Sequence, residues 1–249
     1  MTLAGKVAVV TGASRGLGRT LAVALAEAGA QIALLARPSP ELAAVETEIG
    51  PRGSVAVECD VADPDSVNQA IARVVALFGG IDILINNAAI YSLGTIETIS
   101  DADIRDQLAI DLAGPIYCAR AAIRHLRARG GGDIVNLSSE SVRIPFPYLA
   151  VYAAAKAGVE VFSHALQAEV REDRIRVSVF RAGRMGHTDG QRNWDPTMQA
   201  AFFAAIEKSG HAAMGGNAAA TSASMARAII AMLQLPRDVQ AELVEMRAF

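Results

Sequence analysis

Short apolar runs recur along this chain, and a segment of helical length separates each run from the next. Six of these runs are rich in Val, Ile and Leu: residues 7–10, 32–35, 55–57, 81–85, 134–137 and 175–180. Strands that are buried on both faces of a parallel sheet have this composition. The alternation, without a linker or repeat, predicts an α/β fold with one doubly wound parallel sheet of roughly seven strands and helices on both faces.

Capping residues mark the ends of several expected helices. We expect helices over residues 17–28, 41–49, 64–78, 103–129 and 152–171. Asp63 before Pro64 is typical of a helix start. Gly29, Gly50 and Gly79 each follow a helical segment, where a residue in the left-handed conformation is favoured. These boundaries agree with the positions of the apolar runs.

The regular alternation ends near residue 187. Beyond it we predict a substrate-loop region over about residues 187–215, helical segments around 196–209 and 218–233, and a last strand near 241–246. No shift in composition marks a boundary between domains. We therefore expect residues 1–249 to form a single domain.

Composition and charge argue against several classes of partner. The formal net charge of −3 disfavours nucleic acid or an anionic membrane surface. No apolar run approaches the roughly 18 residues that span a bilayer, and the N-terminus lacks a secretory signal. Cys59 and Cys118 form no CxxC pair, and the four histidines show no metal-ligand spacing. We expect a cytoplasmic protein with free thiols and no metal.

A glycine-rich turn, Thr11–Gly18 (TGASRGLG), directly follows the first apolar run. Glycines between a strand and a helix permit a tight turn, and the amides at the helix start then face an anion such as a pyrophosphate. The spacing G-x-x-x-G-x-G differs from the commoner G-x-G-x-x-G of Rossmann-type sheets. The similarity to that motif therefore lies in how glycines and helix amides bind a phosphate, and not in the exact spacing. We interpret the turn as a phosphate-binding loop of a Rossmann-type sheet, and a purely structural turn is the alternative.

A second stretch combines a serine, a tyrosine and a lysine. Ser139 ends an apolar run, and Tyr152 and Lys156 are spaced i and i+4, on one face of a helix. An ammonium beside a phenol stabilises the phenolate and lowers the pKa of the phenol from about 10 towards the range of a general acid or base. Y-x-x-x-K by itself is more often a solvated helix face. Its combination with Ser139 and the glycine-rich turn is what favours catalysis.

Together these motifs resemble those of the short-chain dehydrogenases/reductases, in their compact single-domain branch. The resemblance covers about residues 5–190 and rests on Thr11-Gly12-x-x-x-Gly16-x-Gly18, Cys59-Asp60-Val61, Asn86-Asn87-Ala88, Ser139 and Tyr152-x-x-x-Lys156. Residues 152–170 are similar to bacterial 3-oxoacyl-carrier-protein reductases, whereas the end of the chain resembles members that act on small or varied alcohols. The resemblance implies a dinucleotide-binding catalytic domain.

The resemblance also implies a role for each matching residue. Tyr152 would exchange a proton with the substrate oxygen, Lys156 would lower the pKa of the phenol and hold the nicotinamide ribose, and Ser139 would hydrogen-bond the substrate oxygen. The other residues implied to bind the cofactor are Gly12, Ser14, Gly16, Leu17 and Gly18 at the pyrophosphate and adenosine ribose, Asp60 and Val61 at the adenine, Asn87 and Ala88 at a ribose, and Gly183, Met185 and Thr188 near the nicotinamide.

The residue after the second apolar run indicates which cofactor would bind. A protein that binds NAD needs a carboxylate there to accept a hydrogen bond from the adenosine 2′-hydroxyl. Here Arg37 occupies the position, and no acid follows before Glu41. A guanidinium pairs with a 2′-phosphate, and Arg15 in the glycine-rich turn could contact the same phosphate. We predict NADP(H) as the cofactor, and two solvated surface arginines are the alternative.

The chain departs from the family pattern at three positions. Asp111 replaces an asparagine that helps anchor a water chain leading to the active-site lysine, so a charge is added to the proton relay. Ala89 replaces a glycine, which is tolerable only if its backbone avoids positive φ. The usual Pro-Gly after the sixth strand reads Ala182-Gly183, and loss of the proline would loosen the loop over the nicotinamide.

These residues predict an NADP(H)-dependent oxidoreductase that transfers hydride between the nicotinamide and a ketone or secondary alcohol, with Tyr152 as general acid/base. The expected substrate pocket, mostly apolar with a polar handle, is lined by Tyr91, Glu140, Ile144, Phe146, Tyr148 and the segment 187–211, including Trp194, Phe202 and Phe203. A catalytically weak NADP(H)-binding sensor or assembly protein is the alternative. A nucleotide-sugar epimerase of the extended branch would need a larger C-terminal domain.

Small residues in the helix that carries Tyr152 allow close packing against another helix. In the resembling family, this helix and the one expected over residues 103–129 form a dimer face, so the resemblance implies a homodimer or homotetramer. Burial of the small residues inside a monomer explains the same pattern.

Overall fold

Seven parallel strands lie side by side in one sheet, in the order β3 (Ser54–Glu58), β2 (Gln31–Ala36), β1 (Val7–Thr11), β4 (Ile83–Asn86), β6 (Gly132–Ser139), β7 (Ile175–Ala182) and β9 (Leu243–Met246). The computed structural model describes residues 3–50, 53–186, 191–192, 194, 196–210 and 219–249. All seven strands are parallel to their neighbours. The predicted doubly wound parallel sheet is therefore confirmed.

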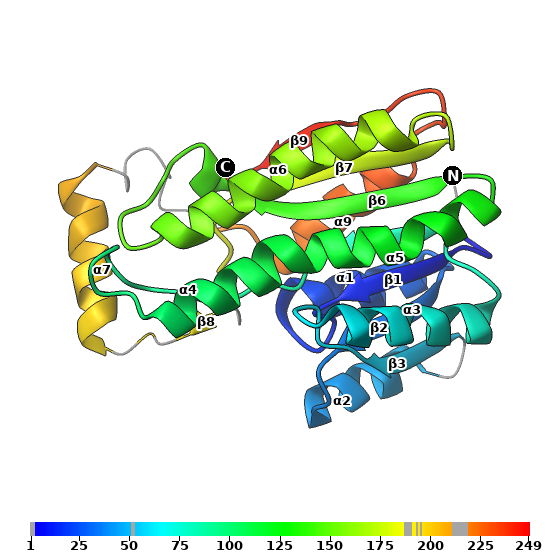
Figure 1. Ribbon diagram of the computed structural model, residues 1–249, viewed down its shortest axis with the longest axis horizontal. Coiled ribbons are helices and arrows are strands. Elements are labelled where there is room, and N and C mark those ends of the chain that lie inside the picture. The colour runs from blue at the N-terminus through cyan, green and yellow to red at the C-terminus, as the bar shows by residue number, and fades with distance from the viewer. Residues whose placement is uncertain (1–2, 51–52, 187–190, 193, 195, 211–218) are drawn as a thin grey trace.

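Helices cover both faces of the sheet, and each face has its own apolar core. One core contains residues of α1 (Gly16–Glu27), α2 (Pro40–Ile49) and α9 (Ser222–Leu233). The other contains residues of α3 (Pro64–Phe78), α5 (Gly114–Ala128) and α6 (Ala150–Val170). Figure 1 shows α5 and α6 running along the sheet on the side nearest the viewer. Strands buried on both faces explain why their sequences are continuously apolar rather than alternating.

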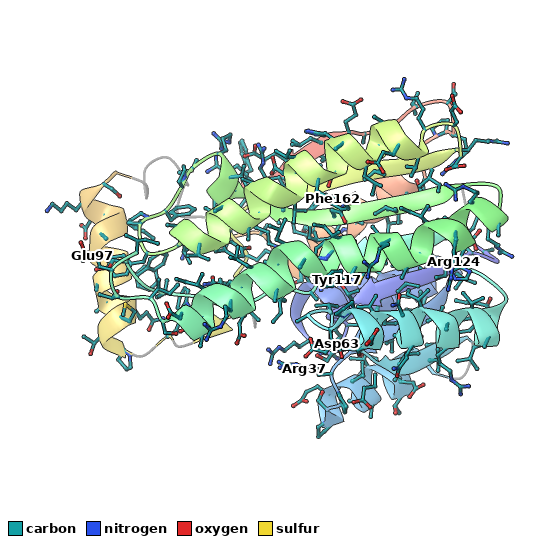
Figure 2. The ribbon with its side chains drawn as sticks, viewed as in Figure 1. Arg37, Asp63, Glu97, Tyr117, Arg124 and Phe162 are labelled. Atoms are coloured by element: carbon teal, nitrogen blue, oxygen red, sulfur yellow. The ribbon has the colours of Figure 1, made fainter. Side chains whose placement is uncertain are left out.

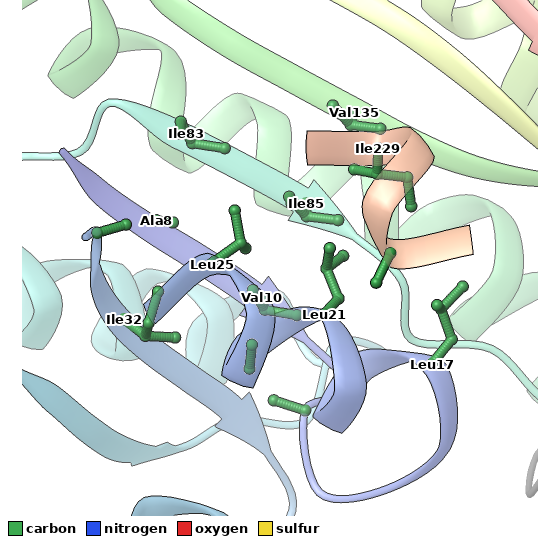
Figure 3. Packing of buried hydrophobic residues seen from close by; sticks show 14 of the residues in the cluster. Ala8, Val10, Leu17, Leu21, Leu25, Ile32, Ile83, Ile85, Val135 and Ile229 are labelled. Carbon is green, nitrogen blue, oxygen red and sulfur yellow. The ribbon is translucent and has the colours of Figure 1, made fainter. Parts of the chain in front are cut away.

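The first helix is held against the sheet by leucines that recur every fourth residue. Leu17, Leu21 and Leu25 of α1 are all buried, the last two completely. Figure 3 shows them facing Val10 of β1 and Ile229 of α9. Because this face of α1 is buried along its length, the start of α1 is fixed at the carboxyl end of β1.

One expected helix is interrupted. Instead of a continuous helix over residues 103–129, the structure has α4 (Asp101–Leu108), a π-helical turn η1 (Ala109–Ala113) and then α5. Ser100 starts α4 by accepting a hydrogen bond from the Asp103 amide at 3.0 Å. A π-helical turn inserts an extra residue into the helix and is frequent at functional sites. It contains Asp111.

A second, two-stranded sheet lies outside the main one and was not predicted. It pairs β5 (Tyr91–Ser92) with β8 (Gln191–Arg192) in parallel. The expected helix around residues 196–209 is observed as α7 (Pro196–Lys208). Figure 1 shows α7 at one end of the molecule, away from α2 and β3.

Some classes of site are absent from the part of the chain that the structure describes. No described helix is both long and apolar enough to cross a bilayer. No three His, Cys, Asp or Glu side chains among the described residues are grouped so as to hold a metal ion. Cys59 and Cys118 are both buried and form no disulfide.

Candidate active site

A cavity of about 1440 Å³ lies at the carboxyl ends of the strands. Residues from the ends of β1, β2, β4, β6 and β7 line it. In doubly wound sheets, ligands bind at this edge, where the strand order reverses. Pockets for a single small ligand measure about 300–1000 Å³. The larger volume here can hold a dinucleotide together with a substrate.

The glycine-rich turn forms one wall of this cavity, and its geometry requires glycine. Gly12 and Gly16 have φ of 65° and 55°, in the left-handed region. A Cβ on Gly18 would overlap the carbonyl oxygen of Gly12 and lie 2.5 Å from Asn87 Nδ2. Asn87 Nδ2 also donates to the carbonyl oxygen of Thr11 at 2.9 Å. Asn87 thus holds the turn in place besides lining the cavity.

The close approach at Gly18 gives a stability prediction. We expect Gly18→Ala to lower the free energy of unfolding by about 1–3 kcal/mol, because the added methyl group must displace backbone. Gly186→Ala is the matched control, since its nearest contact would be Ala219 at an ordinary 3.8 Å. Urea denaturation of both variants measures the difference. Equal stability of the two variants would show that the turn relaxes freely.

Nearly all the residues predicted to bind cofactor or substrate lie around this one cavity. The predicted residues that line it are Gly12, Ser14, Arg15, Gly16, Leu17, Gly18, Arg37, Asp60, Val61, Asn87, Ala88, Ser139, Tyr152, Lys156, Gly183 and Met185. Asp111 does not line the cavity and is completely buried behind it. Thr188 lies outside the described residues.

Ser139, Tyr152 and Lys156 meet where β6 ends and α6 begins. Ser139 Oγ accepts a hydrogen bond from the Ser141 amide at 3.2 Å, at the start of a 3-10 turn, η2 (Glu140–Val142). Lys156 Nζ lies 5.7 Å from the centre of the Tyr152 ring. The same Nζ donates to the carbonyl oxygen of Leu137 at 3.2 Å. The three side chains predicted from their spacing are therefore brought together in space.

The charge environment of Tyr152 differs from the prediction. Burial, followed by the nearby carboxylate of Asp111, raises the pKa of the Tyr152 phenol, although a hydrogen bond with Ser139 opposes the shift. Burial also lowers the pKa of Lys156, while Asp111 opposes that shift. The expected lowering of the phenol's pKa is therefore wrong. Desolvation outweighs stabilisation of the phenolate.

Asp111 is a buried carboxyl group with one of its oxygens unpaired. Its Oδ1 accepts a hydrogen bond from the Ile90 amide at 2.9 Å. Its Oδ2 is buried and makes no hydrogen bond with any residue that the structure describes. Burial raises the pKa of Asp111 to about 7, against the opposing effects of Lys156 and the Ile90 amide. This carboxyl group therefore keeps its proton to a higher pH than an exposed aspartate does.

A chain of ion pairs fixes α6 to the sheet behind the active site. Ser138 Oγ donates to Glu160 Oε1 at 2.5 Å. Arg181 of β7 binds both carboxylate oxygens of Glu160, at 2.9 and 2.6 Å. Its Nη1 donates to Glu245 of β9 at 3.0 Å, and Arg143 donates to the same carboxylate at 2.8 Å. Glu160 lies one helical turn after Lys156, so this network positions the helix that carries the catalytic candidates.

The other two departures from the family pattern are accommodated by the backbone. Among the described residues other than glycine, only Tyr148 and Arg174 have positive φ, so Ala89 meets the condition set for it. After β7, the Gly183 amide donates to the carbonyl oxygen of Met246 at 2.8 Å. The Gly186 amide donates to that of Ala220 at 3.2 Å. Main-chain hydrogen bonds thus hold the loop that lacks proline.

Arg15 and Arg37 lie at the end of the cavity formed by β2 and α1. Both are exposed, and neither forms a salt bridge with another described residue. Figure 2 shows Arg37 at the surface close to α2. Glu41 lines the same end, and its pKa is lowered by its own amide, the Ser39 hydroxyl and Arg15. Two guanidinium groups are available there for an anion.

The opposite end of the cavity is largely apolar. Of the residues predicted to line a substrate pocket, Tyr91, Glu140, Phe146, Trp194, Phe202 and Phe203 do so, whereas Ile144 and Tyr148 do not. Gln199, Ile206 and Glu207 of α7 also line it; they lie within the predicted lining segment 187–211, although they were not singled out individually. Their spacing from Phe202 and Phe203, at three to four residues, was a usable signal of a shared helix face.

Comparison with known proteins agrees with this geometry. The family model of the short-chain dehydrogenases matches residues 6–199. The chain belongs to the short-chain dehydrogenase family. It is therefore an oxidoreductase of a family that acts on alcohol and carbonyl groups, and the resemblance inferred from its motifs is confirmed.

Individual members of the short-chain dehydrogenase family show how far the similarity extends. A D-threitol dehydrogenase of Mycolicibacterium smegmatis is 36% identical over 195 residues, covering 78% of this chain and 75% of that enzyme. A versicolorin reductase of Emericella nidulans is 35% identical over 185 residues, covering 73% and 69%. The structure of an alcohol dehydrogenase from Thermococcus sibiricus, complexed with 5-hydroxy-NADP, has a TM-score of 0.81 at 26% identity, covering 97% and 96%.

Proposed function

We propose that this protein is an NADP(H)-dependent oxidoreductase that transfers hydride between the nicotinamide and a carbonyl or secondary alcohol substrate. The observation that carries the proposal is a single cavity with the glycine-rich turn at one end and Ser139, Tyr152 and Lys156 in its wall. Binding of a nucleotide alone does not require the three side chains to converge. An oxidoreductase needs both features in one cavity.

The residues around the turn fit a dinucleotide. A Cβ at Gly18 would fill the space against Gly12 and Asn87, so the backbone there can approach a pyrophosphate closely. The amides at the start of α1 face the same side, where a helix N-terminus favours an anion. Asp60, Val61, Gly183 and Met185 also line the cavity; the first two would hold the adenine and the last two the nicotinamide. When bound, the nicotinamide supplies or accepts the hydride.

Three observations support NADP(H) over NAD(H). Arg37 occupies the place where an NAD-binding protein needs a carboxylate. Arg15 lines the same end of the cavity. The structurally similar Thermococcus sibiricus enzyme is complexed with an NADP derivative. Guanidinium groups bind phosphate through paired, charge-assisted hydrogen bonds, which an adenosine 2′-phosphate would satisfy.

In the proposed reaction, Tyr152 gives a proton to the carbonyl oxygen in reduction, or takes it from the alcohol in oxidation. Ser139 orients that oxygen, since its hydroxyl already hydrogen-bonds the phenol. Lys156 is held beside the ring by the Leu137 carbonyl and contributes a cation to the site. Positioning of the reacting groups supplies much of the rate enhancement in such enzymes.

Asp111 gives the proposed reaction a distinctive pH dependence. Below pH about 7 its carboxyl group is neutral; above that value it is charged and raises the pKa of Tyr152. A phenol with a higher pKa is a weaker proton donor. We therefore expect kcat for ketone reduction to fall several-fold as pH rises through about 7.

The Asp111→Asn variant isolates this effect, because its amide oxygen can still accept the Ile90 hydrogen bond. We expect the variant to keep activity and to lose the step near pH 7. Steady-state kcat measured across the pH range for both proteins tests this. A step of equal size in both proteins would assign the titration to another group.

The experiment that tests the proposed function follows the loss of NADPH absorbance in the presence of a panel of ketones. Turnover with at least one ketone supports the proposal. The alternative, a catalytically weak NADP(H)-binding sensor or assembly protein, is motivated by the raised pKa of Tyr152. That alternative predicts tight NADPH binding without turnover on any ketone.

The names of two relatives support a small-molecule substrate, since one is a versicolorin reductase and the other a D-threitol dehydrogenase.

We also propose that the protein is cytoplasmic and self-associates as a homodimer or homotetramer through α5 and α6. Val161 on α6 is apolar and 70% exposed, which supports an interface there. Tyr117 on α5 and Phe162 on α6 lie on the same side of the molecule (Figure 2).

A further inference from the structure

Four aromatic side chains form a continuous row that leads away from the proposed proton donor. The centre of the Tyr91 ring lies 5.5 Å from that of Tyr152, with the rings tilted by 50°. Trp194 lies 5.5 Å from Tyr91, nearly perpendicular to it at 81°, and Phe202 lies 5.5 Å from Trp194 at 58°. All four line the cavity. We call these four residues the aromatic wall.

The aromatic wall is held in place by the fold. Tyr91 is in β5, which pairs with β8 two residues before Trp194. Phe202 of α7 is buried together with Leu93 and Leu149 in a small apolar cluster that the other wall residues contact. The rings therefore face the cavity in tilted and perpendicular orientations without help from a ligand.

Trp194 adds one polar group to this apolar surface. Its Nε1 is buried and makes no hydrogen bond with any described residue. A buried indole N–H usually has a hydrogen-bond partner, and leaving a donor unsatisfied is unfavourable. Tyr91 alone separates Trp194 from Tyr152 in the row of rings. Trp194 is thus the second ring along the row from Tyr152, the proposed proton donor.

We propose that the substrate is an aryl ketone, or the corresponding benzylic alcohol, that carries a second oxygen able to accept a hydrogen bond from Trp194 Nε1. This inference rests on the proposed function, because the reacting carbonyl is placed at Tyr152. Aromatic rings gain from edge-to-face and offset contacts with other rings beyond what burial of area provides. A saturated ring gains only the free energy of burying its apolar surface. A polyol would bury more hydroxyl groups than the few polar groups of the aromatic wall can bind.

Three small ketones test the inference by binding to the protein saturated with NADP⁺. Acetophenone has the aryl ring, para-methoxyacetophenone adds the second oxygen, and cyclohexyl methyl ketone is the saturated analogue. We expect acetophenone to bind about threefold to tenfold more tightly than the saturated ketone. We expect the methoxy compound to gain a further factor of about threefold to tenfold. Isothermal titration calorimetry gives the three Kd values regardless of how fast each ketone reacts.

Variants assign each preference to its side chain. Trp194→Phe keeps the ring and removes the N–H, so it should abolish the advantage of the methoxy compound and leave that of acetophenone. Tyr91→Leu removes a ring of the aromatic wall and should reduce the preference for acetophenone. Phe162→Leu, on α6 (Figure 2) but not among the residues that line the cavity, is the control and should change neither ratio. Thermal unfolding verifies that each variant is folded.

Two results would overturn the inference: equal Kd values for the three ketones, or an unchanged methoxy advantage in Trp194→Phe. Its failure is distinguishable from failure of the proposed function. If the predicted order of Kd values is found but no ketone is reduced, the proposed function is wrong and the ligand preference stands. If ketones are reduced with no preference for the aryl ring, the function stands and the inference is wrong.

Discussion

Replacing Tyr152 with phenylalanine should lower kcat for ketone reduction by about 10²–10⁴-fold, the usual contribution of a positioned general acid. The ring and its contacts with Tyr91 and Lys156 would remain, because only the hydroxyl group is removed. The Kd for NADPH should therefore change little. Steady-state kinetics together with calorimetric titration of NADPH separate the two effects.

Tyr91→Phe is the matched control for this variant. Tyr91 lies in the same cavity, 5.5 Å from Tyr152, and also carries a phenol. We expect its kcat to remain within a few-fold of the wild type, since proton transfer is assigned to Tyr152 alone. Equal losses in the two variants, or retention of full activity in Tyr152→Phe, would remove Tyr152 from its proposed role.

Reversing the charge at Arg37 should change the preferred cofactor. Arg37→Asp would remove a cation that pairs with the 2′-phosphate of NADPH and place a carboxylate where an NAD-binding protein has one. We expect the Kd for NADPH to rise about 100-fold, and that for NADH to fall or stay unchanged. Calorimetric titration of both cofactors into the wild type and the variant measures the shift.

Arg124→Asp is the control for a general effect of charge. Arg124 is at the surface of α5, away from Arg37 (Figure 2). Arg124→Asp makes the same change in net charge as Arg37→Asp and should leave the ratio of the Kd values for NADPH and NADH unchanged. A wild-type protein that already binds NADH more tightly than NADPH would contradict the cofactor assignment.

The sheet could be predicted from sequence because its strands carry a local signal. Strands such as β1 and β7 are buried on both faces, so continuous apolar runs mark them. The two-residue strand β5 has too few residues for any such pattern and pairs with a strand far along the chain. The π-helical turn around Asp111 could not be predicted from the sequence for a different reason. Its sequence continues a helical pattern, and only the packing of the helix reveals the inserted residue.

The members of the candidate site could be predicted, but their electrostatics could not. Tyr152 and Lys156 are one helical turn apart, so their proximity follows from local geometry. The raised pKa of Tyr152 depends on burial and on Asp111, which comes from another helix. Likewise, Arg181 and Glu245 are paired across β7 and β9, 64 residues apart in the chain. Such contacts are set by tertiary packing, and spacing in the sequence carries no sign of them.

The central claim is that hydride passes between the nicotinamide and a carbonyl carbon in this cavity. NADPH carrying deuterium on one or the other face of its nicotinamide C4 tests it directly, with para-methoxyacetophenone as substrate and mass spectrometry of the alcohol product. We predict that deuterium from one of the two labelled cofactors is found at the carbinol carbon and that none arrives from the other. Alcohol formed without deuterium from either cofactor, or no alcohol from any ketone tested, would contradict the account.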